Sequence, residues 1–206
     1  MTDLLSFGSP LFWFIVSMVA LLLIWLRWKL HRKRRYDLSK ITLKDIDKMD
    51  GHEFEDYLFV LLSALPYEQV YQTKKSRDYG ADLIFEDEGV RTVVQAKRYR
   101  EKLGLSAVQE IFTAQTYYKA NQAVIITTAS RISDPCLKLA SATGVKIIDR
   151  EDLEDMIRLF KKGRMDEASD ILEEPIEPVS YKPSDSLERP SEKRGMIQAG
   201  DYFYRL

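Results

Sequence analysis

Apolar residues follow one pattern in the first part of this chain and another pattern in the rest. Residues 11–28 read LFWFIVSMVALLLIWLRW, without a charged side chain before Arg27 and with Trp13, Trp25 and Trp28 near the two ends. A helix of this length spans about 27 Å, close to the hydrocarbon thickness of a bilayer. Tryptophan at both ends is typical of membrane–water interfaces. The segment therefore predicts one transmembrane helix that holds the chain in a lipid bilayer.

The charges on either side of this segment predict its orientation. Six Lys and Arg residues lie between Arg27 and Arg35, whereas Asp3 is the only charged residue before Leu11. Positive charge collects on the cytoplasmic side of a membrane helix, so we expect a single-pass protein of the cell membrane with the rest of the chain in the cytoplasm. A cleaved signal peptide would need its basic cluster before the apolar segment and a small-residue cleavage site after it. The basic cluster is also suited to anionic lipid headgroups or to DNA.

From residue 36 onward, apolar positions recur with the spacing of short helices and strands. Spacings of three and four predict helices over residues 50–65, 105–120, 133–144 and 150–160. Alternating or continuous apolar runs predict strands over residues 67–73, 81–86, 91–99, 122–128 and 145–149. Asp50 with Glu53, and Ser106 with Gln109, have the spacing of helix capping boxes. The order αβββαβαβα predicts an α/β fold with a mixed central sheet flanked by helices.

These patterns divide the chain into four parts. Residues 1–35 form the predicted anchor with its basic flank, residues 36–50 a short helical connector, and residues 51–163 the folded domain. Residues 164–206 are acidic and contain four prolines, which is typical of a segment without a core of its own. The aromatic residues in the final MIQAGDYFYRL could dock on the domain or on a partner, and a frayed end is the simpler interpretation.

Composition and charge exclude several classes of protein. Cys136 is the single cysteine, and His31 and His52 are the two histidines, so a disulfide framework, a cysteine-based zinc cluster and a histidine-rich metal site are excluded. After residue 35 the chain has 25 Lys and Arg against 31 Asp and Glu, so a generally basic DNA-binding surface is absent. Two local basic clusters remain, either as DNA contacts or as solvated surface: Lys74, Lys75 and Arg77, and then Lys97, Arg98, Arg100 and Lys102.

Polar residues interrupt two of the predicted strands between these basic clusters. In GADLIFEDEGVRTVVQAKRYR, Asp82 lies on one strand, and Gln95 and Lys97 lie two residues apart on the next. Because side chains alternate along a strand, Gln95 and Lys97 share a face. An aspartate, an amide and a lysine together are unusual in a core. They are typical of a metal-dependent phosphodiesterase site.

An ordered set of segments from Gly51 to about Ile157 resembles the Mrr-like branch of the PD-(D/E)xK nuclease superfamily. The matching segments are HEFEDYLFVLL, SRDYGADLIF, VVQAKRY, LSAVQEI, AVIITTA and GVKIIDREDL. No segment is diagnostic alone, and the order and spacing of the set carry the resemblance. The resemblance implies a restriction-endonuclease-like fold for residues 51–163.

The same resemblance implies a DNA endonuclease that uses Mg²⁺ or Mn²⁺ to hydrolyse phosphodiester bonds in restriction, defence or DNA processing. It implies Asp82, Gln95 and Glu55 as metal ligands and Lys97 as the catalytic lysine. Glu55 is our choice for the helix glutamate because it follows the aromatic Phe54. The implied partners are DNA and, beside the lipid bilayer, a second copy of the chain in a homodimer.

Two positions depart from the superfamily's general pattern. Ala81 precedes Asp82 where the pattern has proline, and Gln95 stands where it has an acid. An amide offers a metal one neutral oxygen, whereas a carboxylate offers charge and two oxygens. Glutamine at this position is a known variant of the Mrr-like branch, so an active nuclease is still expected. A catalytically inactive, membrane-tethered nucleic-acid-binding or scaffold protein is the alternative, which plasmid cleavage by the fragment from residue 36 would exclude.

Overall fold

The structure is a computed structural model that describes residues 10–30, 37–74, 79–176, 178–187, 191–193, 196–199 and 201–205. The chain divides into two units, Met1–Lys40 and Ile41–Leu206. Of the predicted DNA-binding residues, Lys75 and Arg77 lie outside the described residues.

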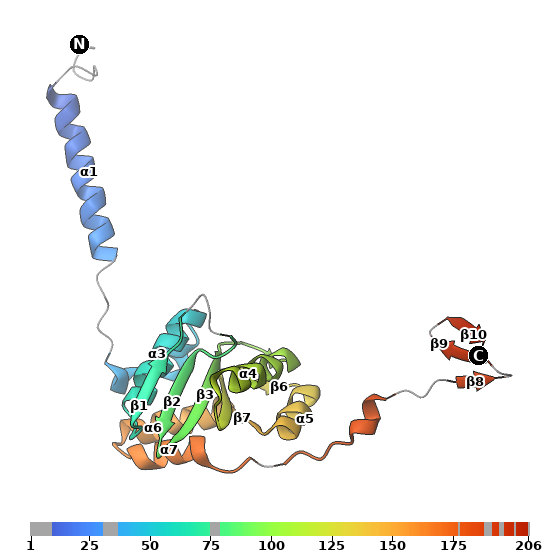
Figure 1. Ribbon diagram of the computed structural model, residues 1–206. Helices are drawn as coiled ribbons and strands as arrows, with labels where there is room; N and C mark the ends of the chain where they lie inside the picture. The colour runs from blue at the N-terminus through green and yellow to red at the C-terminus, as the bar shows by residue number, and fades with distance from the viewer. Residues whose placement is uncertain are drawn as a thin grey trace. The chain divides into compact units, whose positions relative to one another are not determined.

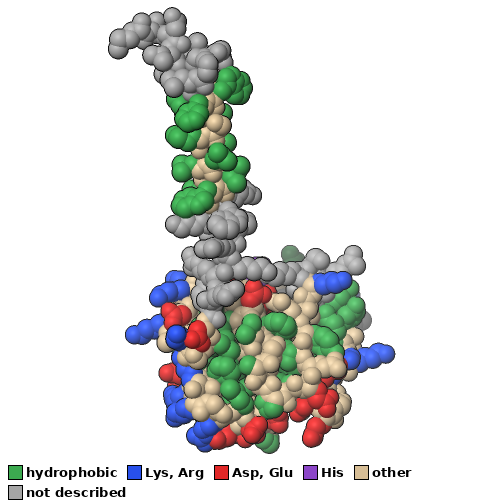
Figure 2. All heavy atoms as spheres, turned by 90° about the vertical axis from the view of Figure 1, so that its left-hand side faces the viewer, with side chains coloured by type: hydrophobic (Ala, Val, Ile, Leu, Met, Phe, Trp, Pro, Cys, Tyr) green, Lys and Arg blue, Asp and Glu red, His purple; other side chains and the backbone are tan. Residues whose placement is uncertain are grey.

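The first unit contains one long helix over the apolar segment. Helix α1 runs from Pro10 to Leu30, and it is followed by a short 3₁₀ turn over Leu38–Lys40. The side chains described in α1 extend from Phe12 to Leu26, and most of them are exposed apolar groups that surround the helix (Figure 2). Within the described residues, no helix combines the length and the apolar character needed to cross a membrane.

The second unit is built on a five-stranded mixed sheet in the order β1-β2-β3-β5-β7 (Figure 1). Strands β1 (Gln69–Gln72), β2 (Leu83–Asp87) and β3 (Val90–Lys97) are antiparallel neighbours. Strands β5 (Gln122–Thr127) and β7 (Val145–Ile148) continue the sheet parallel to β3. The tight turn between β2 and β3 has Glu88 and Gly89 at positive φ, as two-residue hairpin turns require. The predicted mixed α/β sheet is therefore confirmed.

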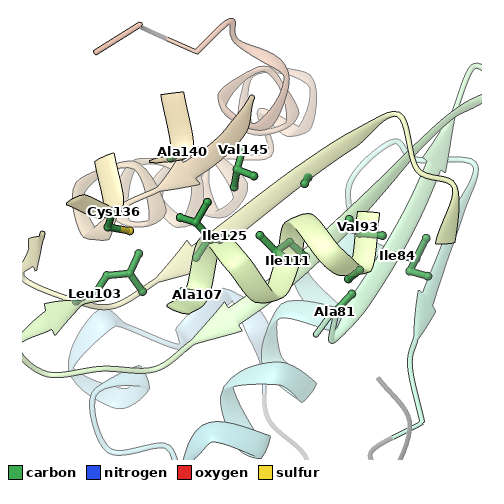
Figure 3. Close-up of a cluster of buried hydrophobic side chains, with 14 residues drawn as sticks. Ala81, Ile84, Val93, Leu103, Ala107, Ile111, Ile125, Cys136, Ala140 and Val145 are labelled. Carbon is green, nitrogen blue, oxygen red and sulfur yellow. The ribbon is translucent and has the colours of Figure 1, made fainter. Parts of the chain in front are cut away.

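Helices cover both faces of this sheet. Helices α4 (Leu105–Tyr118) and α5 (Asp134–Thr143) bury a cluster that includes Val93, Ile111 and Ile125 (Figure 3). Helices α3 (Gly51–Ser63) and α6 (Arg150–Lys161) also pack on the sheet strands. Neighbouring residues such as Val93 and Val94 are both buried, because successive side chains point to opposite faces. This double coverage explains the continuous apolar run AVII in β5.

The helix caps test the sequence patterns directly. Asp50 and Glu53 form the predicted reciprocal capping box at the start of α3, with N–H to oxygen distances of 2.8 and 3.0 Å. The predicted capping box of Ser106 and Gln109 is wrong, because α4 begins at Leu105 and its N-cap is Gly104. The chain enters α4 from the short strand β4 (Lys102–Leu103), where Leu103 is buried. Anchoring of Leu103 places Ser106 inside the first turn, where it does not cap the helix.

Several elements were missed by the sequence patterns. Strand β4 pairs with β6 (Arg131–Ile132) as a separate parallel ribbon. The predicted helical connector does contain a short helix, α2 (Leu43–Ile46). Helix α7 (Met165–Glu173) follows directly after Arg164 and packs on α6. Its buried residues are Ala168, Ser169 and Leu172. The spacing of Ala168 and Leu172 fits a helix, but both lie among acidic residues directly before the proline-containing segment, and this composition assigned them to the tail.

The C-terminal segment forms strands of its own. A 3₁₀ turn lies at Pro183–Ser186, and β8 (Ser191–Lys193), β9 (Met196–Ala199) and β10 (Tyr202–Arg205) make an antiparallel sheet in the order β10-β9-β8. The aromatic side chains of β10 are exposed. The segment for which we expected a frayed end therefore contains a hairpin.

Candidate active site

Asp82 lies one residue before β2 and is fixed to the backbone of β3. Its N–H donates to the carbonyl oxygen of Val94 at 2.9 Å, and its carboxylate Oδ2 accepts from the N–H of Ala96 at 2.7 Å. The neighbouring register pairs Leu83 with Val94. These bonds hold the Asp82 carboxylate beside the strand that carries Gln95 and Lys97.

Gly80 brings the loop before Asp82 into contact with α4. Its φ is +93°, and a Cβ atom at this position would lie 2.7 Å from the carbonyl oxygen of Glu110. That distance is too short for any side chain, so only glycine allows the loop to approach the helix this closely. The positions of Asp82 and of the middle turn of α4 are consequently linked.

Gln95 is buried near the end of β3, with 3% of its surface exposed. Its Nε2 donates to Oε2 of Glu110 at 2.8 Å. Its Oε1 is buried and has no hydrogen-bond partner within the part of the chain that the structure describes. Because buried polar atoms are almost always satisfied, this acceptor is available to a bound cation or water.

Lys97 shares the same carboxylate oxygen. Its Nζ lies 2.7 Å from Oε2 of Glu110, and 19% of the lysine side chain is exposed. Partial burial would raise the pKa of Glu110, but the hydrogen bonds from Lys97 and Gln95 together hold it below its usual range. One ionised carboxylate therefore joins the two predicted site residues of β3.

Glu110 is the site residue that the sequence patterns missed. It lies in LSAVQEI, one of the segments that carry the family resemblance, and it is the only acidic residue of α4. The capping-box pattern pointed instead to the neighbouring Gln109. A single acid in the middle of a helix, placed among buried residues, was the available signal.

Glu55 lies on α3, directly after the buried Phe54, and 18% of its side chain is exposed. Its Oε2 is 3.2 Å from Nδ1 of His52, one turn earlier on the same helix. Helix α3 packs on β2 and β3, the strands that carry the other predicted ligands. Glu55 therefore stays a predicted ligand, with a described contact that lies within its own helix.

The predicted metal ligands are Asp82, Gln95 and Glu55. Among the described residues there is no group of three or more His, Cys, Asp and Glu side chains that could hold a metal. The predicted set is instead two carboxylates and an amide. The Asp82 carboxylate and the buried Gln95 Oε1 come from neighbouring strands and are the hard oxygen donors that Mg²⁺ prefers. The donor chemistry of these two residues fits a divalent cation.

Some of the predicted DNA-binding side chains are exposed, and one is hydrogen-bonded within the domain. Lys74, Arg100 and Lys102 are exposed. Arg98 is partly buried, its Nη2 donates to the carbonyl oxygen of Asp47, and its Nε has no partner within the described residues. Arg98 is therefore committed to the fold, whereas the other three side chains are accessible.

A second polar cluster lies where β3 and β5 lead into their loops. The guanidinium of Arg150 donates to both carboxylate oxygens of Asp47 at 2.7 and 2.8 Å and to the carbonyl oxygen of Thr128 at 3.1 Å. This hydrogen-bonded guanidinium holds the pKa of Asp47 below its usual range. A cavity of about 390 Å³ is lined by Asp47, Arg100, Ser130 and Arg150. The surroundings of this cavity are cationic, because Asp47 balances only one of the arginines.

An aspartate beside one strand and a Gln-x-Lys pair on the next, in a mixed sheet between two layers of helices, define a nuclease domain of the restriction-endonuclease class. The chain belongs to the Mrr_cat family, which is described as restriction endonuclease. The family matches residues 46–157, more than half of the chain. This result confirms the family expected from the sequence.

Comparisons with individual proteins add little to this assignment. No curated protein matches the chain. A solved structure of the "ATP-dependent Type ISP restriction-modification enzyme LlaBIII bound to DNA" is similar at 22% sequence identity and a TM-score of 0.44. The similarity covers 56% of this chain and 8% of that chain, so the present chain spans a small part of that enzyme's length.

Proposed function

We propose that this protein is a DNA endonuclease that requires a divalent cation, Mg²⁺ or Mn²⁺. The observation that carries the proposal is the buried, unsatisfied Gln95 Oε1 on β3, the strand that also carries Lys97 and whose Ala96 N–H holds the Asp82 carboxylate. Membership of the restriction endonuclease family supports the same reaction. Defence against foreign DNA is the role that we favour, and DNA processing is the second.

Asp82 and Gln95 would hold the cation, with Glu55 as a further ligand from α3. A divalent cation at this position would supply a Lewis acid that activates water and offsets charge on the phosphate. Lys97 enters as an ion-paired ammonium, and an ammonium donates hydrogen bonds but cannot take a proton. We therefore assign Lys97 to neutralising the phosphoryl oxygens in the transition state, not to deprotonating the water.

The test is cleavage of supercoiled plasmid by the full-length protein with Mg²⁺, with Mn²⁺ or with EDTA. We expect nicked and linear products with either cation and none with EDTA. Asp82→Asn should remove cleavage, whereas Lys138→Ala, on the exposed side of α5, should leave it unchanged. Binding of plasmid without cleavage under all conditions would favour the alternative, an inactive nucleic-acid-binding protein.

We place the DNA backbone along the loops that follow β3 and β5. Arg100 and Arg150 line the cavity beside Ser130, so this region combines positive charge with a hydroxyl donor. Phosphate contacts of this kind fix the position of a duplex without reading its sequence. Lys74 and Lys102 are exposed and would add further contacts with the backbone.

We also propose that residues 11–28 anchor the protein in the cell membrane, with the nuclease domain in the cytoplasm. The support comes from the sequence: the uncharged apolar residues before Arg27 and the basic cluster that follows them. Alkaline carbonate should fail to extract the full-length protein from membranes. A tag after Leu206 should resist protease added to intact cells, and ready cleavage of that tag would contradict the orientation.

A further inference from the structure

Both residues of the Gln-x-Lys pair are held by one oxygen atom of α4. Oε2 of Glu110 accepts from Nε2 of Gln95 at 2.8 Å and from Nζ of Lys97 at 2.7 Å. The sequence patterns gave Glu110 no role, and the function proposed above does not use it. The arrangement assigns it one.

The carboxylate decides which end of the Gln95 amide faces the site. An amide has a donor end and an acceptor end, whereas an ionised carboxylate can only accept. Contact with Glu110 therefore forces Nε2 toward α4 and turns Oε1 away from it. Oε1 is the buried atom that lacks a partner among the described residues, and it is the atom that a cation would need.

The backbone of Glu110 is held in place by the packing of α4. The adjacent Ile111 is fully buried, as are Ala107 and Val108 one turn earlier, so the helix cannot slide over the sheet. On its other side, the Glu110 backbone is in close contact with Gly80 in the loop that leads to Asp82. The Glu110 backbone is thus fixed relative to both strands of the site, and its partly exposed carboxylate is held by the hydrogen bonds from Gln95 and Lys97.

We propose that Glu110 is a positioning residue that aims Gln95 Oε1 at the divalent cation and holds Lys97 beside it. The inference rests on the proposed metal-dependent function. It also explains how a neutral amide serves where the superfamily pattern has an acid. A carboxylate needs no such aid, because both of its oxygens accept.

A double-variant cycle measures this orienting effect. Glu110→Ala removes the group that sets the amide, so cation affinity should fall about 10-fold or more, as expected when a partner that orients a metal ligand is lost. Gln95→Glu in the Glu110→Ala protein should recover the affinity, because either oxygen of the new carboxylate can bind the cation. Gln95→Glu alone places two carboxylates within hydrogen-bond distance, so its gain in affinity should be much smaller.

The measurement is Mn²⁺ binding by the full-length protein without DNA, followed by electron paramagnetic resonance of the free cation. Gln109→Ala is the matched control on the same helix, since Gln109 is exposed and should leave affinity unchanged. All proteins are compared well below their thermal midpoints. A purely structural role of Glu110 would lower the midpoint and leave the cation affinity of the folded protein unchanged.

The outcomes separate this inference from the proposed function. A wild-type protein that does not bind Mn²⁺ would overturn both. Normal binding by wild-type and Glu110→Ala proteins alike would overturn only the role of Glu110. If the effects of the two substitutions on Mn²⁺ affinity simply add, the role of Glu110 is also overturned, because Glu110 then does not act through Gln95. A stronger effect of Gln95→Glu in the Glu110→Ala protein would support the inference.

Discussion

Two carboxylates in the second unit each hold a basic side chain at 2.7 Å, but they hold it differently. Asp47 uses both oxygens on Arg150, and its main-chain oxygen also accepts from Arg98. Glu110 uses one oxygen for two donors, Gln95 and Lys97, and a buried acceptor beside it has no partner within the described residues. Both oxygens of the Asp47 carboxylate are used within the fold, and we call this arrangement a closed pair, whereas the Glu110 arrangement leaves the Gln95 acceptor for a ligand.

The difference shows which feature of an ion pair indicates function. Asp47 and Arg150 are 103 residues apart, and their bidentate contact fastens the segment before α3 to the start of α6. Lys97 and Glu110 lie on adjacent elements that already pack together. A contact that closes the fold should matter for stability, and a contact between incompletely satisfied groups should matter for chemistry.

The largest effect, a loss of cleavage, should come from replacing Lys97 with alanine. Lys97→Ala should lower plasmid cleavage about 100-fold or more, since preorganised charge at the phosphate is worth at least that much. Its free energy of unfolding should change by about 1 kcal/mol or less, because the ion pair with Glu110 stays in contact with solvent and is screened by it. Cleavage rates with saturating Mg²⁺ and urea denaturation provide the two numbers.

Arg150→Ala should show the opposite balance. Losing the hydrogen bonds to Asp47 should cost about 1–2 kcal/mol of unfolding free energy, because charge-assisted bonds exceed that value when buried and are weakened here by solvent. Cleavage should fall only as far as DNA binding does. A Lys97→Ala protein that cuts at the wild-type rate would refute the mechanism, and an Arg150→Ala protein of full stability would refute the closed-pair interpretation.

Gly80 tests the link between Asp82 and α4. Gly80→Ala adds strain at φ +93° and a Cβ 2.7 Å from the Glu110 carbonyl oxygen, so we expect about 1–3 kcal/mol of destabilisation and reduced cleavage. Gly89→Ala is the matched control, because its φ is +78° but no atom lies within 4 Å of the added Cβ. Equal losses in the two variants, measured by thermal unfolding, would show that the close contact with α4 is unimportant.

The sequence indicated most of the fold because local patterns decided it. The capping box of Asp50 and Glu53, the turn at Glu88–Gly89 and the continuous apolar run of β5 each have a local physical cause. Helix α7 was missed because its acidic composition and the prolines that follow it outweighed the helical spacing of Ala168 and Leu172. The wrong cap at Ser106 has a tertiary cause, because burial of Leu103 sets where α4 begins.

The site was predictable only in part for a related reason. The alternation of side chains along a strand predicted that Gln95 and Lys97 share a face, and their hydrogen bonds to Glu110 agree with that prediction. Glu110 itself lies 13 residues beyond Lys97 on another element, and no local rule joins them. The residue that bonds to the buried Gln95 amide depends on how α4 packs across the sheet. This packing is tertiary structure, which local sequence patterns do not specify.

Arg100 should contribute a smaller effect, seen only in DNA binding. Each phosphate contact that is lost reduces the slope of log affinity against log salt by about one unit. Arg100→Ala should therefore lower the slope by about one, and Lys138→Ala, in an exposed pair on α5, should not change it. Fluorescence anisotropy of a labelled duplex in EDTA, over a range of salt, gives the slopes. An unchanged slope for Arg100→Ala would mean that Arg100 makes no phosphate contact and is an ordinary solvated surface residue.

The smallest effect concerns pH and again separates the two carboxylates. Arg150 lowers the pKa of Asp47 in the folded protein, so the pair stabilises the fold above the unfolded aspartate pKa, which is about 3.9. That contribution is lost as the pH falls through the lower, folded pKa. The difference in unfolding free energy between wild type and Asp47→Asn should therefore be constant near neutral pH and shrink only below about pH 4. Urea denaturation from pH 7 to pH 3 tests this, and a difference that shrinks already above pH 5 would mean that Asp47 is not held by Arg150.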